Sequence, residues 1–107
     1  MSDRELLELA AKAAGYVLQE TEDGYECNFD DSRIWNPLTD GGDALQLMVG
    51  LRLEPRFIDN SHSNGAEPSR VTLHNVAGIV ENIDGDPLAA TRRAIVRAAA
   101  EIGRNMK

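Results

Sequence analysis

The chain has 107 residues, of which 18 are acidic and 11 are basic, and its formal net charge at pH 7 is −7. This length is typical of a single domain, so we expect one domain over residues 1–107, without an intrachain disulfide because Cys27 is the only cysteine. The acidic balance disfavours non-specific nucleic acid binding, and no stretch approaches the roughly 18 consecutive apolar residues of a membrane span.

The first predicted element is a helix over residues 3–14. Ser2 followed by Glu5 is a capping-box pattern, apolar residues then recur at helical spacing, and Gly15 ends the pattern. The acids of these first turns stand where a secretory signal has its basic region, so we expect a cytoplasmic protein.

A β-hairpin is predicted next. Residues 16–19 and 25–29 are rich in β-favouring types and flank an Asp-Gly pair at 23–24, which is typical of tight turns. Residues 33–35 either prolong the second strand or form a short third one. We expect Trp35 to be a core anchor, because its neighbours are apolar.

A second helix is predicted from a cap at Thr39 or Asp40 to about residue 51. The 3–4 spacing of its apolar residues predicts a buried face of Ala44, Leu45, Met48 and Leu51.

Further β-like segments follow this helix. Residues 53–58 predict a strand that lies at a sheet edge or begins after Pro55, because proline cannot donate a ladder hydrogen bond. Turn formers fill residues 59–69 and predict a long flexible loop. Residues 70–74 and 79–83 predict two more strands, or one bulged strand.

The Asp-Pro pair at 86–87 is a strong start signal for a last helix over residues 87–104. Alanines at 94 and 98 would allow a neighbouring element to approach closely. The predicted buried stripe consists of Leu88, Ile95, Ala99, Ile102 and Met106.

The predicted element order is α-β-β-α-β-β(-β)-α. Hairpins separated by helices favour an α+β fold, with one mainly antiparallel sheet of 4–5 strands and three helices on one or both of its faces.

Charge is unevenly distributed along the chain. The predicted hairpin is dense in acids, which are either a solvated rim or an acidic face that mimics nucleic acid phosphates or docks on a basic partner. These acids are Glu20, Glu22, Asp23, Glu26, Asp30 and Asp31.

The last helix carries the opposite charge. Arg92, Arg93 and Arg97 lie largely off its apolar stripe. They are a solvated basic face, or they pair with the acidic hairpin within the chain or across a dimer, or they contact nucleic acid.

Catalytic and metal motifs are weak in this sequence, and we expect no cofactor, no metal and no catalytic residue. Asp30, Asp31, Asp40 and Asp43 are oxygen ligands that suit calcium or magnesium, but their spacing fits no known loop. His62 and His74 have no partner at zinc-ligand spacing, and the acids near Cys27 suppress a thiolate nucleophile.

Three stretches resemble a known family: DRELLELAAKAAGY at 3–16, WNPLTDGGDALQL at 35–47 and DPLAATRRAIVRAAAEIGRNM at 86–106. They are similar to small bacteriophage and prophage proteins described as the phage ABA sandwich domain. This resemblance implies an α-β-α sandwich, a bacterial host cytoplasm and a phage accessory role. It implies no site residues, because the function of that family is unknown.

The leading hypothesis is a non-catalytic phage or prophage accessory protein that binds a host or phage protein, in host takeover or in counter-defence such as anti-CRISPR activity. An alternative is a small domain that binds or converts a nucleotide-like ligand, with the loop at 59–69 as a lid and Arg92 or Arg93 as anion contacts. A third hypothesis is a homo-oligomer whose interface uses the last helix.

Overall fold

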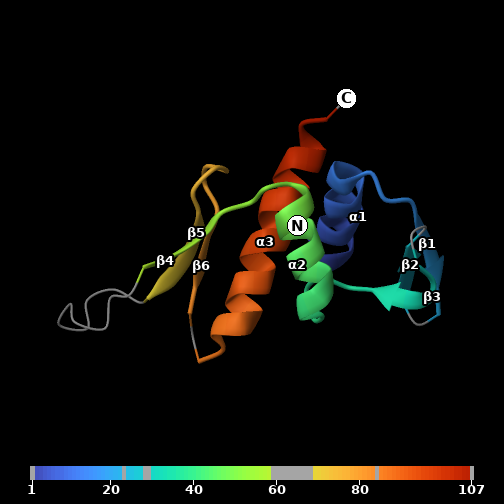
Figure 1. Ribbon diagram of the computed structural model, residues 1–107, viewed down its shortest axis with the longest axis horizontal. Helices are drawn as coiled ribbons and strands as arrows, with labels where there is room; N and C mark the ends of the chain where they lie inside the picture. The colour runs from blue at the N-terminus through green and yellow to red at the C-terminus, as the bar shows by residue number, and fades with distance from the viewer. Residues whose placement is uncertain (1, 23, 28–29, 59–68, 84, 107) are drawn as a thin grey trace.

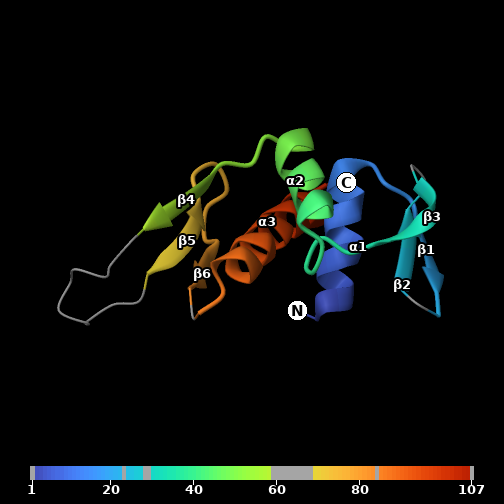
Figure 2. The same cartoon turned by 60° about the horizontal axis from the view of Figure 1, so that its bottom comes forward.

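The computed structural model describes residues 2–22, 24–27, 30–58, 69–83 and 85–106. Over these residues, three helices lie between two antiparallel sheets of three strands each. Figure 1 shows this layering along the long axis, and Figure 2 shows it again from a second direction. The α+β class is confirmed. The expected α-β-α layering is wrong, because the helices are inside and the sheets are outside.

The helices agree with their predicted ranges: α1 (Asp3–Ala14), α2 (Gly41–Gly50) and α3 (Pro87–Arg104). Each begins at a side chain that accepts a hydrogen bond from a backbone N–H of the first turn, and these capping residues are Ser2, Asp40 and Asp86. Gly15, with a left-handed φ of 78°, ends α1. The helix boundaries therefore follow from local capping chemistry.

Sheet A consists of β1 (Leu18–Thr21), β2 (Gly24–Cys27) and β3 (Asp30–Trp35). The strands pair antiparallel in chain order, so the predicted hairpin is confirmed and its optional third strand is present.

Sheet B consists of β4 (Pro55–Ile58), β5 (Arg70–Leu73) and β6 (Val80–Asn82), which also pair antiparallel in chain order. Pro55 begins the edge strand β4, as its missing N–H predicts. The predicted loop lies outside the described residues except for Ser69.

The expected single sheet of 4–5 strands is wrong, because sheets A and B are separate. Sheet A lies beside α1 and sheet B lies beside α3, so the helices keep the two sheets apart (Figure 1). Strands β3 and β4 are consecutive in sequence, but α2 connects them across this helical layer. In each sheet, therefore, the three strands are consecutive in the sequence.

Close packing of α1 on α3 forms the centre of the core. Ala10 on α1 and Ala99 on α3 are fully buried, as are the alanines at 94 and 98 that were expected to allow a close approach. At Gly103 the backbones come so near that a Cβ atom would lie 2.0 Å from the Leu9 carbonyl oxygen. No side chain larger than hydrogen fits at this point.

Trp35 is the core anchor predicted from the sequence, with only 1% of its surface exposed. Its ring meets Tyr16 edge to face, with centroids 5.8 Å apart. The turn after Trp35 is held by Asp43, whose carboxylate is buried and accepts a hydrogen bond from the Asn36 N–H at 2.9 Å. Asp43 is thus a buried structural acceptor as well as a helix-start acid.

Three positions of the predicted buried stripes are wrong, because Leu45, Leu88 and Met106 are exposed. Leu88 lies in the first turn of α3 and Met106 lies beyond its end, so both stand at the ends of the helix rather than in its buried middle. On α2, Leu47 takes the core position that the spacing assigned to Leu45.

We expect Gly103→Ala to lower the free energy of unfolding by about 1–3 kcal/mol, because the added methyl collides with backbone that cannot move aside. This loss exceeds the roughly 1 kcal/mol that alanine gains in helix propensity. Gly50→Ala is the matched control, because its added methyl has no neighbour within 4 Å beyond the adjoining residues and backbone of its own helix, and it should leave stability unchanged or raise it. Equal effects in chemical denaturation would contradict the close helix contact.

Candidate functional site

The predicted acidic residues do not share one face of sheet A. Glu20 pairs with Tyr25 in the face toward α1, whereas Glu26 pairs with Gln19 and Ile34 in the opposite face. Glu22 is exposed in the turn. Asp23 and the side chains of Asp30 and Asp31 lie outside the described part, so a partner role for this acidic segment stays a prediction.

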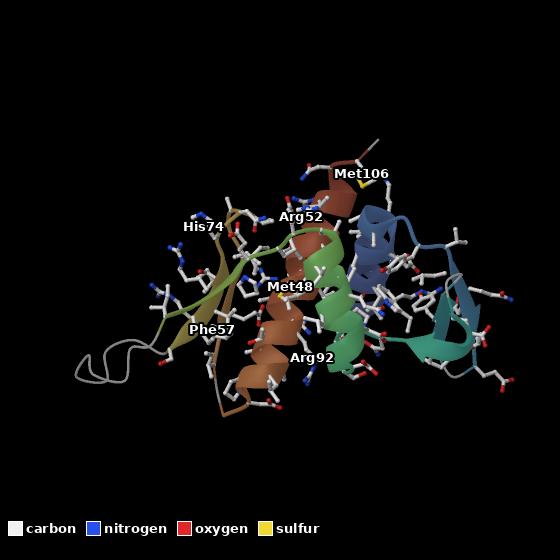
Figure 3. The ribbon with its side chains drawn as sticks, viewed as in Figure 1. Met48, Arg52, Phe57, His74, Arg92 and Met106 are labelled. Carbon is white, nitrogen blue, oxygen red and sulfur yellow. The ribbon has the colours of Figure 1, made fainter. Side chains whose placement is uncertain are left out.

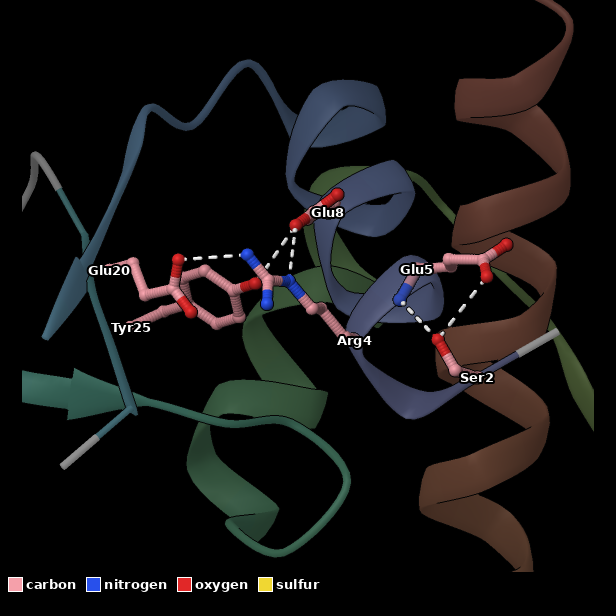
Figure 4. A network of polar contacts seen from close by, with 6 residues as sticks. All are labelled: Ser2, Arg4, Glu5, Glu8, Glu20 and Tyr25. Atoms are coloured by element: carbon pink, nitrogen blue, oxygen red, sulfur yellow. Dashed lines mark hydrogen bonds and ion pairs between the residues drawn. The ribbon is translucent and has the colours of Figure 1, made fainter. Parts of the chain in front are cut away.

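A polar network connects sheet A to α1 (Figure 4). Arg4 forms an ion pair with Glu20 at 2.8 Å and another with Glu8 at 3.2 Å. The Tyr25 hydroxyl donates to the same Glu8 oxygen at 2.9 Å. Glu20 therefore holds the hairpin against the first helix.

This network shifts the pKa values of Glu8 and Tyr25. Hydrogen bonds from Tyr25 and then from Arg4 lower the pKa of the Glu8 carboxyl, because both donors stabilise its charged form. Desolvation, followed by the hydrogen bond to Glu8, raises the pKa of the Tyr25 hydroxyl.

The arginines predicted as a basic face of α3 all have partners within the chain. Arg92 donates through Nε to the Leu38 carbonyl at 2.9 Å. Arg93 pairs with Asp3 of α1 at 3.2 Å. Neither contact involves the acidic hairpin.

Arg97 closes the free edge of sheet B. Its Nη1 donates to the Val80 carbonyl at 2.8 Å and to the Glu81 carboxylate at 2.5 Å. The pair is half-buried, and it satisfies a backbone acceptor that edge strand β6 would otherwise present. Arg97 is therefore a structural residue.

A pocket of about 310 Å³ opens beside these arginines, between α1, α3 and β6. Its apolar lining comes from Leu6, Ile79 and Ala100, and its polar lining from Arg93, Arg97, Glu81 and Glu101. Two of the predicted basic residues thus come together in one concave site, while Arg92 lies outside it. Leu6, Ile79, Glu81, Ala100 and Glu101 were not predicted as site residues, because only the packing of three separate elements brings them together.

Exposed apolar side chains mark a second candidate surface. Leu45 and Val49 on α2 are 54% and 65% exposed, and they stand four residues apart on the same side of that helix. We call this pair the α2 face. Figure 3 shows other exposed side chains well separated from it, including Phe57 on sheet B and Met106 near the chain end.

The metal and nucleophile candidates are dispersed. His74 contacts Arg56 at 3.1 Å on sheet B (Figure 3 labels His74), whereas His62 and the Cys27 side chain lie outside the described part. Asp40 and Asp43 serve the start of α2. No group of three or more His, Cys, Asp or Glu residues that could hold a metal occurs among the described residues.

Comparisons with known proteins found no matching family model, no matching curated protein and no matching solved structure. The resemblance to phage ABA sandwich proteins therefore stays a prediction from three stretches of sequence. Among the described helices, none has the length and apolar character needed to cross a membrane.

We expect Glu8→Gln to destabilise the protein at neutral pH. Because the pKa of Glu8 is lower in the folded state than the ordinary carboxyl value of 4.5, its ionised carboxylate stabilises the fold at pH values above 4.5. This contribution is lost as the pH falls through the folded-state pKa. The stability difference between wild type and variant should therefore shrink on acidification below 4.5.

Urea unfolding at several pH values measures this difference, and Glu22→Gln in the exposed turn is the matched control. A difference that does not change with pH would show that the charge of Glu8 plays no part in holding sheet A.

Proposed function

We propose that this protein is a small non-catalytic binding protein that uses the α2 face to dock on another protein. The exposure of Leu45 and Val49 is the observation that carries this proposal. Both lie on a ten-residue helix whose other side already buries Ala44 and Leu47 in the core. Since one apolar side is enough to hold a surface helix, a second apolar side favours contact with a partner.

The geometry of the α2 face suits recognition of an apolar groove. Side chains four residues apart form one ridge along a helix, and pairs at this spacing are the usual anchors when a helix enters a groove on another protein. The flanking positions Gln46 and Gly42 are exposed, and neither carries a charge that would have to be desolvated. A partner with an aliphatic or aromatic groove fits this surface.

Charge would change the rate of association with the partner more than the stability of the final complex. The chain carries −7, and its acids include Glu22 in the β1–β2 turn and Glu26 in β2, in the part of the molecule away from α2. A partner with a basic surface beside its groove would therefore be attracted at long range, and the rate of association would fall with added salt.

The biological setting comes from the sequence resemblance alone. It supports a phage or prophage accessory protein acting on a host or phage protein in the bacterial cytoplasm, with counter-defence such as anti-CRISPR activity as one such role. The sheet-outside layering differs from the sandwich that the family implies, so the proposed binding role depends on the α2 face and not on the family.

The test is to isolate a partner from infected host lysate, purify it and measure its affinity for variants of the full chain. We expect Leu45→Ser with Val49→Ser to weaken binding by at least about tenfold, because buried anchors at protein interfaces contribute about 1–2 kcal/mol or more each. Circular dichroism and thermal unfolding check that this double variant and the control variant described next retain the fold.

Leu88→Ser is the matched control, because Leu88 is 71% exposed on α3 and is not part of the α2 face. It should bind like the wild type. If the control loses as much affinity as the double variant, or if the double variant keeps full affinity, the α2 face is not the docking surface.

A further inference from the structure

The pocket between α1, α3 and β6 has a chemistry that the docking proposal does not use. Arg93, Arg97 and Glu101 lie at intervals of four residues along α3, so their side chains project from one side of the helix. Arg92 points elsewhere and donates to the Leu38 carbonyl in the connection before α2. The pocket is therefore a site separate from the contacts of α2.

Each of the two guanidinium groups in the pocket uses only one of its nitrogen atoms in hydrogen bonds to described residues. Within the described part of the chain, Arg93 donates to Asp3 through Nη1 alone, and Arg97 donates to Val80 and Glu81 through Nη1 alone. The Nη2 and Nε donors of each arginine are thus available for a carboxylate, whose two oxygens match this planar fork.

Existing contacts hold these arginines in position. The ion pair of Arg97 with Glu81 fixes it to the edge of sheet B, with side chains 33% and 19% exposed. Arg93 is joined to the first turn of α1 by Asp3. A ligand therefore meets groups that are already oriented, which lowers the entropic cost of binding.

The rest of the pocket suits an apolar body. Leu6 on α1, Ile79 before β6 and Ala100 on α3 are almost fully buried and supply its apolar lining. A volume of about 310 Å³ admits a small organic molecule and is at the lower end of ligand pockets, which span roughly 300–1,000 Å³.

The charges around the pocket restrict the ligand further. Arg93 is paired with Asp3, Arg97 with Glu81 and Glu101 with Arg104, so the charged groups at the pocket sum to zero. A phosphate ester with two negative charges would meet both carboxylates and the −7 charge of the chain. A single carboxylate is held by local hydrogen bonds and brings less repulsion.

We propose that this pocket binds a small monocarboxylate with a short aliphatic chain. The carboxylate accepts hydrogen bonds from the Nη2 and Nε donors of Arg93 and Arg97, and the chain packs on Leu6, Ile79 and Ala100. This differs from the nucleotide-like ligand considered from the sequence, because Arg92 takes no part and a polyanion is disfavoured.

The binding test uses the full chain labelled with nitrogen-15 and titrated with 4-methylpentanoate. We expect saturable amide shifts in residues 79–81 and 93–101. The neutral isostere 4-methylpentanamide should cause none, and adenosine monophosphate should bind more weakly than the acid. Equal binding of the acid and the amide, or no saturable shift with the acid, would overturn the proposal.

Variants separate recognition from general charge effects. Arg93→Gln should weaken binding of the acid about tenfold, since it removes a charge-assisted hydrogen bond. The matched control Arg92→Gln should leave the affinity unchanged, and Glu101→Gln should raise it, because one negative charge leaves the lining. If Arg92→Gln weakens binding as much as Arg93→Gln, the effect is that of net charge and the pocket is not the site.

Thermal unfolding of each variant confirms that the fold is kept. The α2 face is not altered in these variants, so affinity for a protein partner should remain. Loss of carboxylate binding is therefore distinguishable from failure of the docking proposal.

Discussion

The contact of α1 with α3 at Gly103 is the constraint on which the other parts of this structure depend. A Cβ atom there would lie 2.0 Å from the Leu9 carbonyl oxygen, so the helices touch through backbone and small side chains. Two helices this close form a narrow layer, and each leaves its outer side to be covered. Sheet B packs on the side of α3, and sheet A lies beside α1, joined to it by polar contacts (Figure 1), which explains why the sheets are outside.

The two sheets are attached to this layer by different physical means. Sheet B buries Val71 and Leu73, and it adds the half-buried pair of Arg97 with Glu81 at its edge. Sheet A is attached through Trp35 and through exposed polar contacts around Glu8. The orientation of sheet A therefore depends more on charge, and so on pH and salt, than the orientation of sheet B does.

Several charged residues therefore stabilise the structure of the protein itself. Glu20 holds the hairpin to α1, Arg93 joins α3 to α1, and Arg97 closes the edge of β6. The acidic hairpin and the basic helix do not pair with each other within the described residues, because the layer of helices separates sheet A from the arginines of α3. Among the described residues, the apolar pair on α2 and the pocket beside Arg93 and Arg97 are the surfaces on which the two binding proposals rest.

The sequence by itself determined the helices, their caps and the first hairpin, because these depend on interactions between residues a few positions apart. Ser2 and Asp86 begin their helices as predicted, Asp40 is the cap among the two candidates Thr39 and Asp40, and Pro55 lies on an edge strand. Only the tertiary structure decided which apolar residues are covered, how the strands are divided into two sheets and which partners the arginines find. A 3–4 spacing defines a stripe on a helix but does not reveal the neighbour, so Leu45 and Leu88 are exposed. The pocket likewise exists only because distant segments meet.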